Sequence, residues 1–244
     1  MTHALEVVDL TCGYGDLTVV RNVSLTVEPA TITAVLGRNG AGKTTTLRAI
    51  AGLLPLKSGE VRLHGESING VPAYARRRLG FGYVQENKRI FRQRTVEENL
   101  LMGVYGLGMK RAEEQRRIRE AYDRFPILSE RHDQPAGYLS GGQQQMLAIG
   151  QALLSKPSVL MLDEPSSGLA PSIVNEVMQT VRNLRDEEGM SVLLIEQVVS
   201  TTLAVADNVV VLDIGRVMHA GPADYPGLAQ IVENAYMANT REDS

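Results

Sequence analysis

A glycine-rich segment that ends in a lysine and a threonine is the first feature of this sequence with chemical meaning. GRNGAGKT, Gly37 to Thr44, matches the phosphate-binding loop pattern of Gly, four residues and Gly-Lys-Ser/Thr, between an apolar run and a helical stretch. Glycines let backbone N–H groups turn inward around a phosphate, and the helix N-terminus adds positive potential. Lys43 supplies a charge to the β- and γ-phosphates, and the Thr44 hydroxyl can bind Mg²⁺. The predicted nucleotide-binding residues are Gly37, Arg38, Asn39, Gly40, Ala41, Gly42, Lys43, Thr44 and Thr45.

Two adjacent acidic residues follow a second apolar run, VLMLDEP at 159–165. Ligands bind at the carboxyl ends of parallel strands, so we expect Asp163 to lie beside the Mg²⁺ site. Neighbouring carboxylates repel unless they have different partners, so we assign Glu164 to the attacking water as general base. Without the phosphate loop, such a pair would more often begin a helix.

A second small-residue segment is LSGGQQQ, residues 139–145, which precedes apolar residues at helical spacing. Ser140, Gly141 and Gly142 would form a helix N-terminus suited to an anion. Taken alone, the segment predicts only a capped helix start.

The elements around these motifs predict an α/β fold. Short β-rich runs fill the first thirty-five residues, and apolar strands such as TITAVLG, VLMLD and SVLLI then alternate with helical stretches. Continuous apolar strands of this kind form a parallel sheet covered on both faces. A charged helical insert between residues 86 and 138 predicts a separate lobe, in which Thr95 and Glu98 fit a capping box.

Two basic stretches have simpler interpretations than nucleic-acid binding. Arg76, Arg77 and Arg78 predict the solvated face of a helix, and residues 110–125 predict a surface helix whose charges face water. The net charge of -3 provides no general field for nucleic acid.

The remaining composition excludes several classes of site. Cys12 is the only cysteine, which excludes an internal disulfide and predicts a small buried residue. The four histidines, at positions 3, 64, 132 and 219, have no metal-binding spacing. No secretory signal is visible, and no apolar run approaches the ~18 residues of a spanning helix. We therefore expect a soluble, cytoplasmic chain that reaches a membrane only through a partner.

The order and spacing of GRNGAGKT, Gln85, LSGGQ and VLMLDEP resemble the nucleotide-binding domain of ABC ATPases, from about Leu5 to Ala238. The resemblance implies one domain over residues 1–244 with a P-loop core and mostly parallel sheet, an N-terminal antiparallel β-subdomain and a helical subdomain at about 86–138. It also implies ATP and Mg²⁺ as ligands. Tyr14 matches the aromatic residue that stacks on adenine, and Gln85 the loop glutamine that senses Mg²⁺ and the γ-phosphate.

In this family two domains join head to tail, and each ATP lies between them. The resemblance therefore implies that Ser140, Gly141, Gly142 and Gln143 contact the γ-phosphate held by a partner chain. Two positions depart from the family pattern: Gln197 stands where a histidine is usual, and Ala170 where an aspartate is common. Both concern the hydrolysis rate and coupling between subunits, not ATP binding.

Several strings point to one subgroup. NKRIFRQRTVEENLLMG, LSGGQQQMLAIGQAL, DEPSSGLAP and LLIEQ resemble the ATPases of branched-chain amino acid importers, which share the glutamine at the position of Gln197. The resemblance implies a motor subunit on the inner face of the cell membrane, with Glu164, Gln197 and Gln85 in catalysis. Its implied partners are transmembrane permease subunits, a second homologous ATPase chain or a second copy of itself, and indirectly a solute-binding protein.

Four alternatives remain open at this point. The same motor could serve urea or another polar solute, because the motifs do not separate these cargoes. Gln197 and Ala170 also fit an ATP-gated clamp with weak hydrolysis, although an intact Glu164 opposes it. A soluble ABC ATPase acting on ribosomes or DNA usually carries two ABC units or long insertions. A simple phosphate-loop kinase would leave LSGGQ unexplained.

Overall fold

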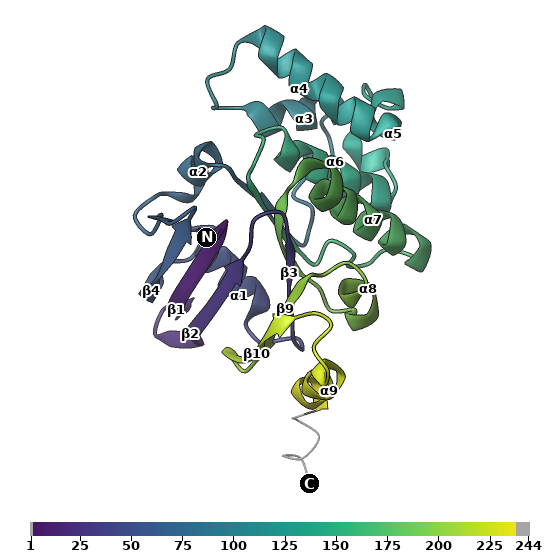
Figure 1. Ribbon diagram of the computed structural model, residues 1–244. Coiled ribbons are helices and arrows are strands. Elements are labelled where there is room, and N and C mark those ends of the chain that lie inside the picture. Colours follow the sequence, from purple (N-terminus) through teal and green to yellow (C-terminus); the bar gives the residue numbers. More distant parts are fainter. Residues whose placement is uncertain (1, 238–244) are drawn as a thin grey trace.

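Two β-sheets and a helical lobe make up the fold in the computed structural model, which describes residues 2–237 (Figure 1). The larger sheet has the strand order β10-β9-β3-β8-β7-β6, and all its neighbouring strands are parallel except β10, which pairs antiparallel with β9. Its strands are β3 (Ile32–Leu36), β6 (Phe81–Val84), β7 (Val159–Asp163), β8 (Ser191–Ile195), β9 (Asn208–Asp213) and β10 (Arg216–Pro222). The predicted α/β fold with a mostly parallel sheet is confirmed.

The smaller sheet is antiparallel, with the order β2-β1-β4-β5. Its strands are β1 (Leu5–Tyr14), β2 (Leu17–Val27), β4 (Leu56–Leu63) and β5 (Glu66–Ser67). This is the predicted N-terminal antiparallel subdomain, but β1 and β2 have 10 and 11 residues, longer than the short strands expected. Bulges interrupt the β1–β2 register, which allows polar residues inside the runs without ending the strands.

The central strands of the larger sheet are buried on both faces. Because side chains alternate along each strand, odd and even residues pack against different elements. In β7, Val159 and Met161 belong to the core shared with the smaller sheet and α1 (Lys43–Ile50). Leu160 and Leu162 belong to the core shared with α6 (Gly141–Leu153) and α7 (Pro171–Glu188). Since side chains alternate along a strand, a continuous apolar run is what a sheet covered on both sides requires.

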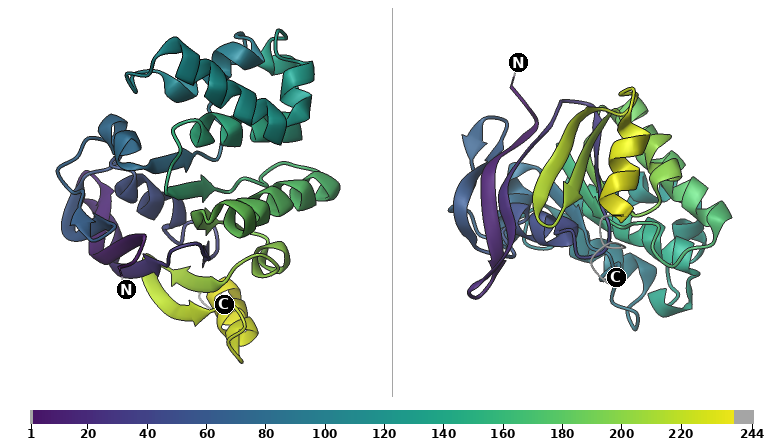
Figure 2. Two further views of the ribbon diagram at one scale, coloured as in Figure 1. Left: turned by 45° about the horizontal axis from the view of Figure 1, so that its top comes forward. Right: turned by 90° about the horizontal axis from the view of Figure 1, so that it is seen from below.

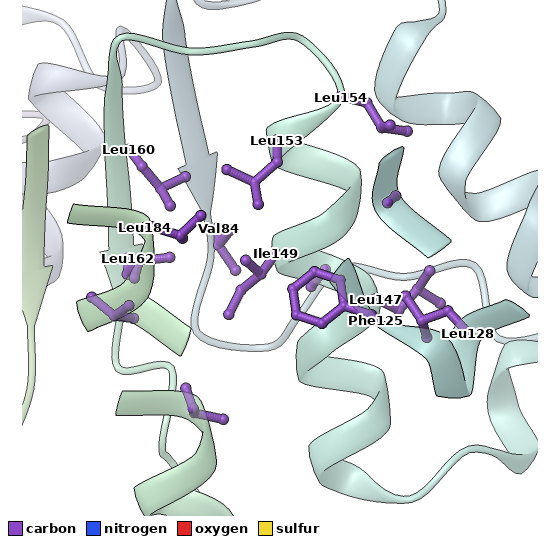
Figure 3. Packing of buried hydrophobic residues seen from close by; sticks show 14 of the residues in the cluster. Val84, Phe125, Leu128, Leu147, Ile149, Leu153, Leu154, Leu160, Leu162 and Leu184 are labelled. Carbon is purple, nitrogen blue, oxygen red and sulfur yellow. The ribbon is translucent and has the colours of Figure 1, made fainter. Parts of the chain in front are cut away.

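The helical lobe contains α3 (Val96–Val104), α4 (Arg111–Arg124) and α5 (Pro126–Glu130), and α6 packs against all three as well as against β6. Figure 3 shows Phe125 and Leu128 meeting Leu147 and Ile149 of α6. The predicted capping box starts α3: the Thr95 hydroxyl accepts from the Glu98 amide at 3.1 Å, and the Glu98 carboxylate accepts from the Thr95 amide at 2.8 Å. This local exchange satisfies two backbone donors of the helix start.

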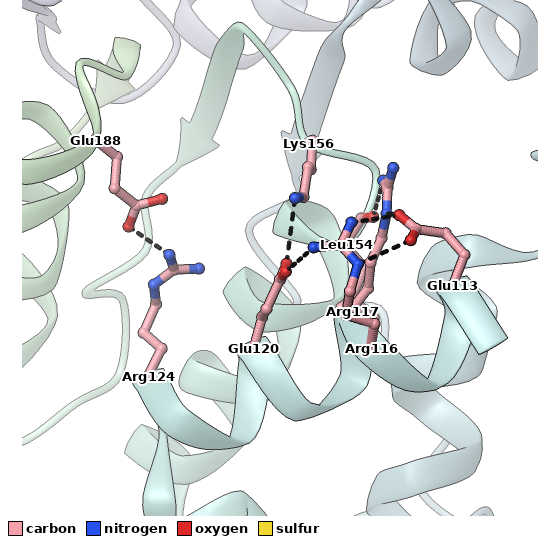
Figure 4. A network of polar contacts seen from close by, with 8 residues as sticks. All are labelled: Glu113, Arg116, Arg117, Glu120, Arg124, Leu154, Lys156 and Glu188. Atoms are coloured by element: carbon pink, nitrogen blue, oxygen red, sulfur yellow. Dashed lines mark hydrogen bonds and ion pairs between the residues drawn. The ribbon is translucent and has the colours of Figure 1, made fainter.

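Some charges of α4 fasten the lobe to the core instead of facing water. Arg117 donates at 2.7 Å to the Leu154 carbonyl after α6 and also pairs with Glu113 (Figure 4). Further along α4, Arg124 pairs with Glu188 at the end of α7. The prediction of a solvated charge run therefore holds for only part of the helix.

The predicted solvated face of the arginines at 76–78 holds for Arg78, which is exposed, but is wrong for Arg76. They lie in α2 (Ala73–Arg76) and the 3₁₀ turn η1 (Arg77–Leu79). Arg76 is buried, and it donates to the carbonyls of Ile68 and Val71, each at 2.9 Å. Burying a guanidinium cation is costly, and here the carbonyl oxygens that accept its hydrogen bonds offset that cost.

The chain ends in α8 (Val199–Leu203) and α9 (Leu228–Met237), which lies beside β9 and β10 (Figure 2, right). Within residues 2–237, no helix is long and apolar enough to span a bilayer.

Candidate functional site

The phosphate-binding segment connects β3 to α1. A Cβ on Gly37 would lie 2.4 Å from the Leu212 carbonyl oxygen, so the close approach of β9 requires glycine there. The Lys43 ammonium group is buried; it donates to the carbonyls of Gly37 at 2.7 Å and Arg38 at 3.2 Å. These bonds place the lysine over the loop, where its charge can bind a phosphate.

The Arg38 side chain, in the predicted nucleotide-binding segment, has a partner within the chain. Its Nε donates at 3.0 Å to Asp213 at the end of β9, and both side chains are largely buried. Arg38 therefore anchors the loop to the end of β9 with its side chain.

Asp163 ends β7 and receives two hydrogen bonds. The Thr44 hydroxyl donates at 3.0 Å to one carboxylate oxygen, and the Tyr83 hydroxyl donates at 3.1 Å to the other. Burial raises the pKa of Asp163, while these two hydrogen bonds lower it. A carboxylate beside a hydroxyl is the kind of oxygen pair that holds Mg²⁺ together with phosphate oxygens.

Tyr83 was not predicted from the sequence. It lies on β6, which is the parallel neighbour of β7, and its pKa is raised by burial and by the adjacent Asp163. The sequence signal for Tyr83 was its position in the strand that leads to Gln85. Parallel strands end at one edge of a sheet, so a polar side chain near the end of that strand can reach the end of β7.

Glu164 adopts a left-handed backbone conformation, with φ 47°. Such a conformation costs about 1–3 kcal/mol for a residue other than glycine and persists only where the surroundings enforce it. Here the Glu164 amide donates at 2.9 Å to the Ile195 carbonyl of β8. Its carboxylate lies 3.7 Å from the Lys43 ammonium group, and the side chain is 15% exposed. The strained turn therefore brings the acidic residue to the phosphate loop.

One cavity of about 640 Å³ brings together residues of the phosphate loop, the end of β7 and the end of β8. Lys43, Thr44, Glu164 and Gln197 line it, and Tyr14 is at its margin, 45% exposed and hydrogen-bonded to Arg48 at 3.1 Å. The other lining residues are Leu17, Val19, Asn39, Gly40, Gly42, Thr45, Glu86 and Ser167. A larger cavity of about 1000 Å³ lies between α4, α5 and α7, but no residue of the phosphate loop lines it.

Gln85 lines a neighbouring cavity of about 220 Å³ instead, between β6 and α6. The residue that follows it, Glu86, is the one that lines the larger phosphate cavity. The structure therefore places Gln85 next to the site and not within it.

The Ser140–Gln143 segment begins α6 with a second capping box. The Ser140 hydroxyl accepts from the Gln143 amide at 3.3 Å, and the Gln143 side chain accepts from the Ser140 amide at 3.0 Å. A Cβ on Gly142 would lie 2.4 Å from Ile173 of α7, so packing requires glycine. Among the described residues that line the phosphate cavity, none comes from this segment. One chain alone does not join the two features.

Gln197 follows β8 and is held by its backbone. Its amide donates at 3.2 Å to Glu196, whose buried carboxylate also accepts from the Ser166 amide at 2.9 Å. Burial raises the pKa of Glu196, and these hydrogen bonds act in the opposite direction. Glu196 was another residue that the sequence analysis did not identify; the signal was an acid directly after an apolar strand.

Proteins that place a phosphate loop against an acidic strand end in this way are P-loop nucleoside triphosphatases, and this chain is one of them. A family model described as ABC transporter matches residues 20–167. The chain belongs to the ABC transporter family and is an ATP-binding subunit with ATPase chemistry.

Similar proteins agree with this assignment. The high-affinity branched-chain amino acid transport ATP-binding protein BraG of Pseudomonas aeruginosa is 43% identical over 84% of this chain and 88% of its own length. A probable branched-chain amino acid transport ATP-binding protein, LivF of Archaeoglobus fulgidus, is 39% identical over 90% and 92%. The structure of cbiO1 from Clostridium perfringens, part of an ABC transporter complex, superposes with a TM-score of 0.83 at 26% identity, covering 100% of this chain and 97% of that one.

Proposed function

We propose that this chain is the motor subunit of an importer for branched-chain or related amino acids. The observation that supports this cargo is the similarity to the two relatives from Pseudomonas aeruginosa and Archaeoglobus fulgidus, whose names state it. The motor itself follows from the family, and it is supported by two contacts of the phosphate loop: Lys43 lies beside Glu164, and Thr44 is hydrogen-bonded to Asp163.

The proposed roles combine the resemblance to ABC ATPases with the positions of these residues in the structure. Lys43 and the loop amides bind the β- and γ-phosphates, and Tyr14 stacks on the base at the cavity margin. Thr44 and Asp163 hold Mg²⁺, which neutralises charge on the phosphates, and Gln85 contributes from the adjacent loop. Glu164 accepts the proton of the attacking water. Gln197 donates a hydrogen bond to the γ-phosphate through its side-chain amide. An amide can donate in this way but cannot relay a proton.

A second ATPase chain would complete the site. The N-terminus of α6 is separate from the phosphate cavity of its own chain, so we assign Ser140, Gly141, Gly142 and Gln143 to the ATP of a partner, either a homologous chain or a second copy. Supplying a transition-state group in trans raises phosphoryl-transfer rates by about 10³–10⁵ in other systems. A dilute monomer should therefore turn over slowly, and its specific activity should rise with concentration or added partner.

Permease subunits would dock on the helical lobe near residues 86–105. This region exposes large apolar side chains, with Phe91 54%, Met102 40% and Tyr105 77% exposed. The Arg77 side chain joins it to the core by donating to the carbonyls of Met102 and Tyr105. Through this contact, movement of the core would reach the lobe and the permease docked on it, and the chain would lie on the inner face of the cell membrane.

The test is transport by the purified complex. The tagged chain is isolated from its own membranes with its partners, reconstituted into vesicles loaded with Mg·ATP, and supplied with the solute-binding protein and labelled leucine or urea. We expect ATP-dependent uptake of leucine, and none with a Lys43→Ala chain. Uptake of urea instead would support the alternative cargo, and co-purification with nucleic acid without any permease would contradict the importer.

A further inference from the structure

The C-terminal helix α9 packs over the strand that leads into the phosphate loop. Its buried residues Leu228, Val232 and Ala235 share a core with Leu36, the last residue of β3, and with Val211 of β9. Figure 2 (right) shows the helix beside β9 and β10. The last turn of α9 therefore lies near Gly37, which follows Leu36 directly.

Tyr236 in that last turn contacts two parts of the ATP site. Its hydroxyl donates to the Gln197 carbonyl oxygen at 3.4 Å and lies near the Gly37 amide. Burial raises the pKa of Tyr236, as do the nearby carboxylates of Glu164 and Glu196, while the Gly37 amide lowers it. One phenol thus lies near the start of the phosphate loop and is hydrogen-bonded to the residue at the position where this family usually has histidine.

The side chain of Gln197 is not held in place by packing as that of a buried residue would be. It is exposed, and it lines both the phosphate cavity and a second cavity of about 530 Å³ that contains Glu196 and Ser166. Its hydrogen bonds among residues 2–237 use the backbone: the amide binds Glu196 and the carbonyl binds Tyr236. A glutamine side chain has several rotatable bonds and is not held in place by itself. The position and orientation of its backbone therefore set the region that the side-chain amide can reach.

We propose that Tyr236 is a positioning residue for ATP hydrolysis: its hydroxyl holds the Gln197 backbone against α9, which packs on β3 and β9, and so makes turnover depend on the seating of α9. This inference rests on the proposed role of Gln197 at the γ-phosphate. The competing interpretation is that Tyr236 only anchors α9, in which case its hydroxyl would affect stability alone.

The experiment is Tyr236→Phe in the assembled transporter complex, because the ring is kept and only the hydroxyl is lost. We expect kcat to fall about two- to tenfold, the range of one ordinary hydrogen bond converted to a rate, while KM for ATP stays within twofold. Tyr225→Phe is the matched control: Tyr225 precedes α9, is 46% exposed and packs on His219 through its ring. This control should leave kcat and thermal stability unchanged.

A double-mutant cycle separates positioning from anchoring. In Gln197→Ala the backbone carbonyl remains but the side chain to be positioned is absent, so adding Tyr236→Phe should lower kcat no further. An equal loss of kcat in both backgrounds would overturn the proposal, as would a Tyr236→Phe complex with the wild-type kcat. If the wild-type complex itself bound no Mg·ATP or hydrolysed none, the proposed function would fail instead, and the two failures are thereby distinguished.

Discussion

Replacing Glu164 by glutamine tests the chemistry most directly, because the change removes a charge and a proton acceptor while keeping the side-chain shape. The substituted residue keeps the hydrogen bond from its backbone amide to the Ile195 carbonyl and its left-handed backbone conformation, so the fold should be preserved. The carboxylate lies 3.7 Å from the Lys43 ammonium group, with side chains 15% and 4% exposed. Lys43 and Glu164 therefore form a largely buried ion pair, and the substitution affects both binding and catalysis.

The expected magnitudes differ for the two steps. A positioned general base contributes about 10²–10⁴ in rate, so kcat should fall by that factor. At an effective dielectric constant of about 20, opposite charges at this separation attract by about 4–5 kcal/mol, largely offset by the cost of desolvating them. Glu164→Gln frees the Lys43 charge for phosphate, so the affinity for Mg·ATP should be unchanged or higher.

The assay compares steady-state phosphate release with equilibrium binding of Mg·ATP in the same assembled complex. Glu86→Gln is the control, since Glu86 is a second carboxylate lining the same cavity and should change kcat by less than threefold. If Glu164→Gln bound Mg·ATP yet hydrolysed it within threefold of the wild-type rate, the general-base assignment would be refuted. The ATP-gated clamp would then be favoured, with Gln197 as its motivating observation.

Four further predictions concern stability and reactivity. Gly103→Ala should lower the free energy of unfolding by about 1–3 kcal/mol, because its Cβ would lie 2.3 Å from the Gln151 carbonyl oxygen. Gly150→Ala in α6, whose Cβ would meet Phe125 at 3.4 Å, should raise it by about 0.5–1 kcal/mol in urea denaturation. Burial favours protonated Glu196, so the contribution of this group to the free energy of unfolding is complete below pH 4.5 and is lost as pH rises through the raised pKa. Glu196→Gln should therefore flatten this part of a Tm-versus-pH curve. Burial raises the pKa of Cys12 to about 11, so iodoacetamide should label it at pH 8 only after denaturation; rapid labelling of the native chain would contradict its buried position.

The local motifs could be predicted from the sequence because their physics is local. The capping boxes at Thr95 and Ser140 each join residues three positions apart. The loop from Gly37 to Thr44 requires a strand before it and a helix after it, and both could be recognised from adjacent residues. Alternating apolar strands and helices likewise predicted the parallel sheet.

Contacts between distant residues depended on strand order and register, which no local pattern specifies. The pairing of β6 with β7 brings Tyr83 to Asp163, 80 residues away. The burial of Arg76 depends on carbonyls of neighbouring loops, so three arginines in a row did not predict it.

The amino-acid sequence by itself therefore determined what each motif can bind, because donors, acceptors and glycines act within a few residues of one another. The tertiary structure alone decided which groups support them, including Asp213 beneath Arg38 and Tyr236 beside Gln197. The physical reason is that a hydrogen bond acts over about 3 Å, and only the packed sheet and its covering helices bring such distant segments that close.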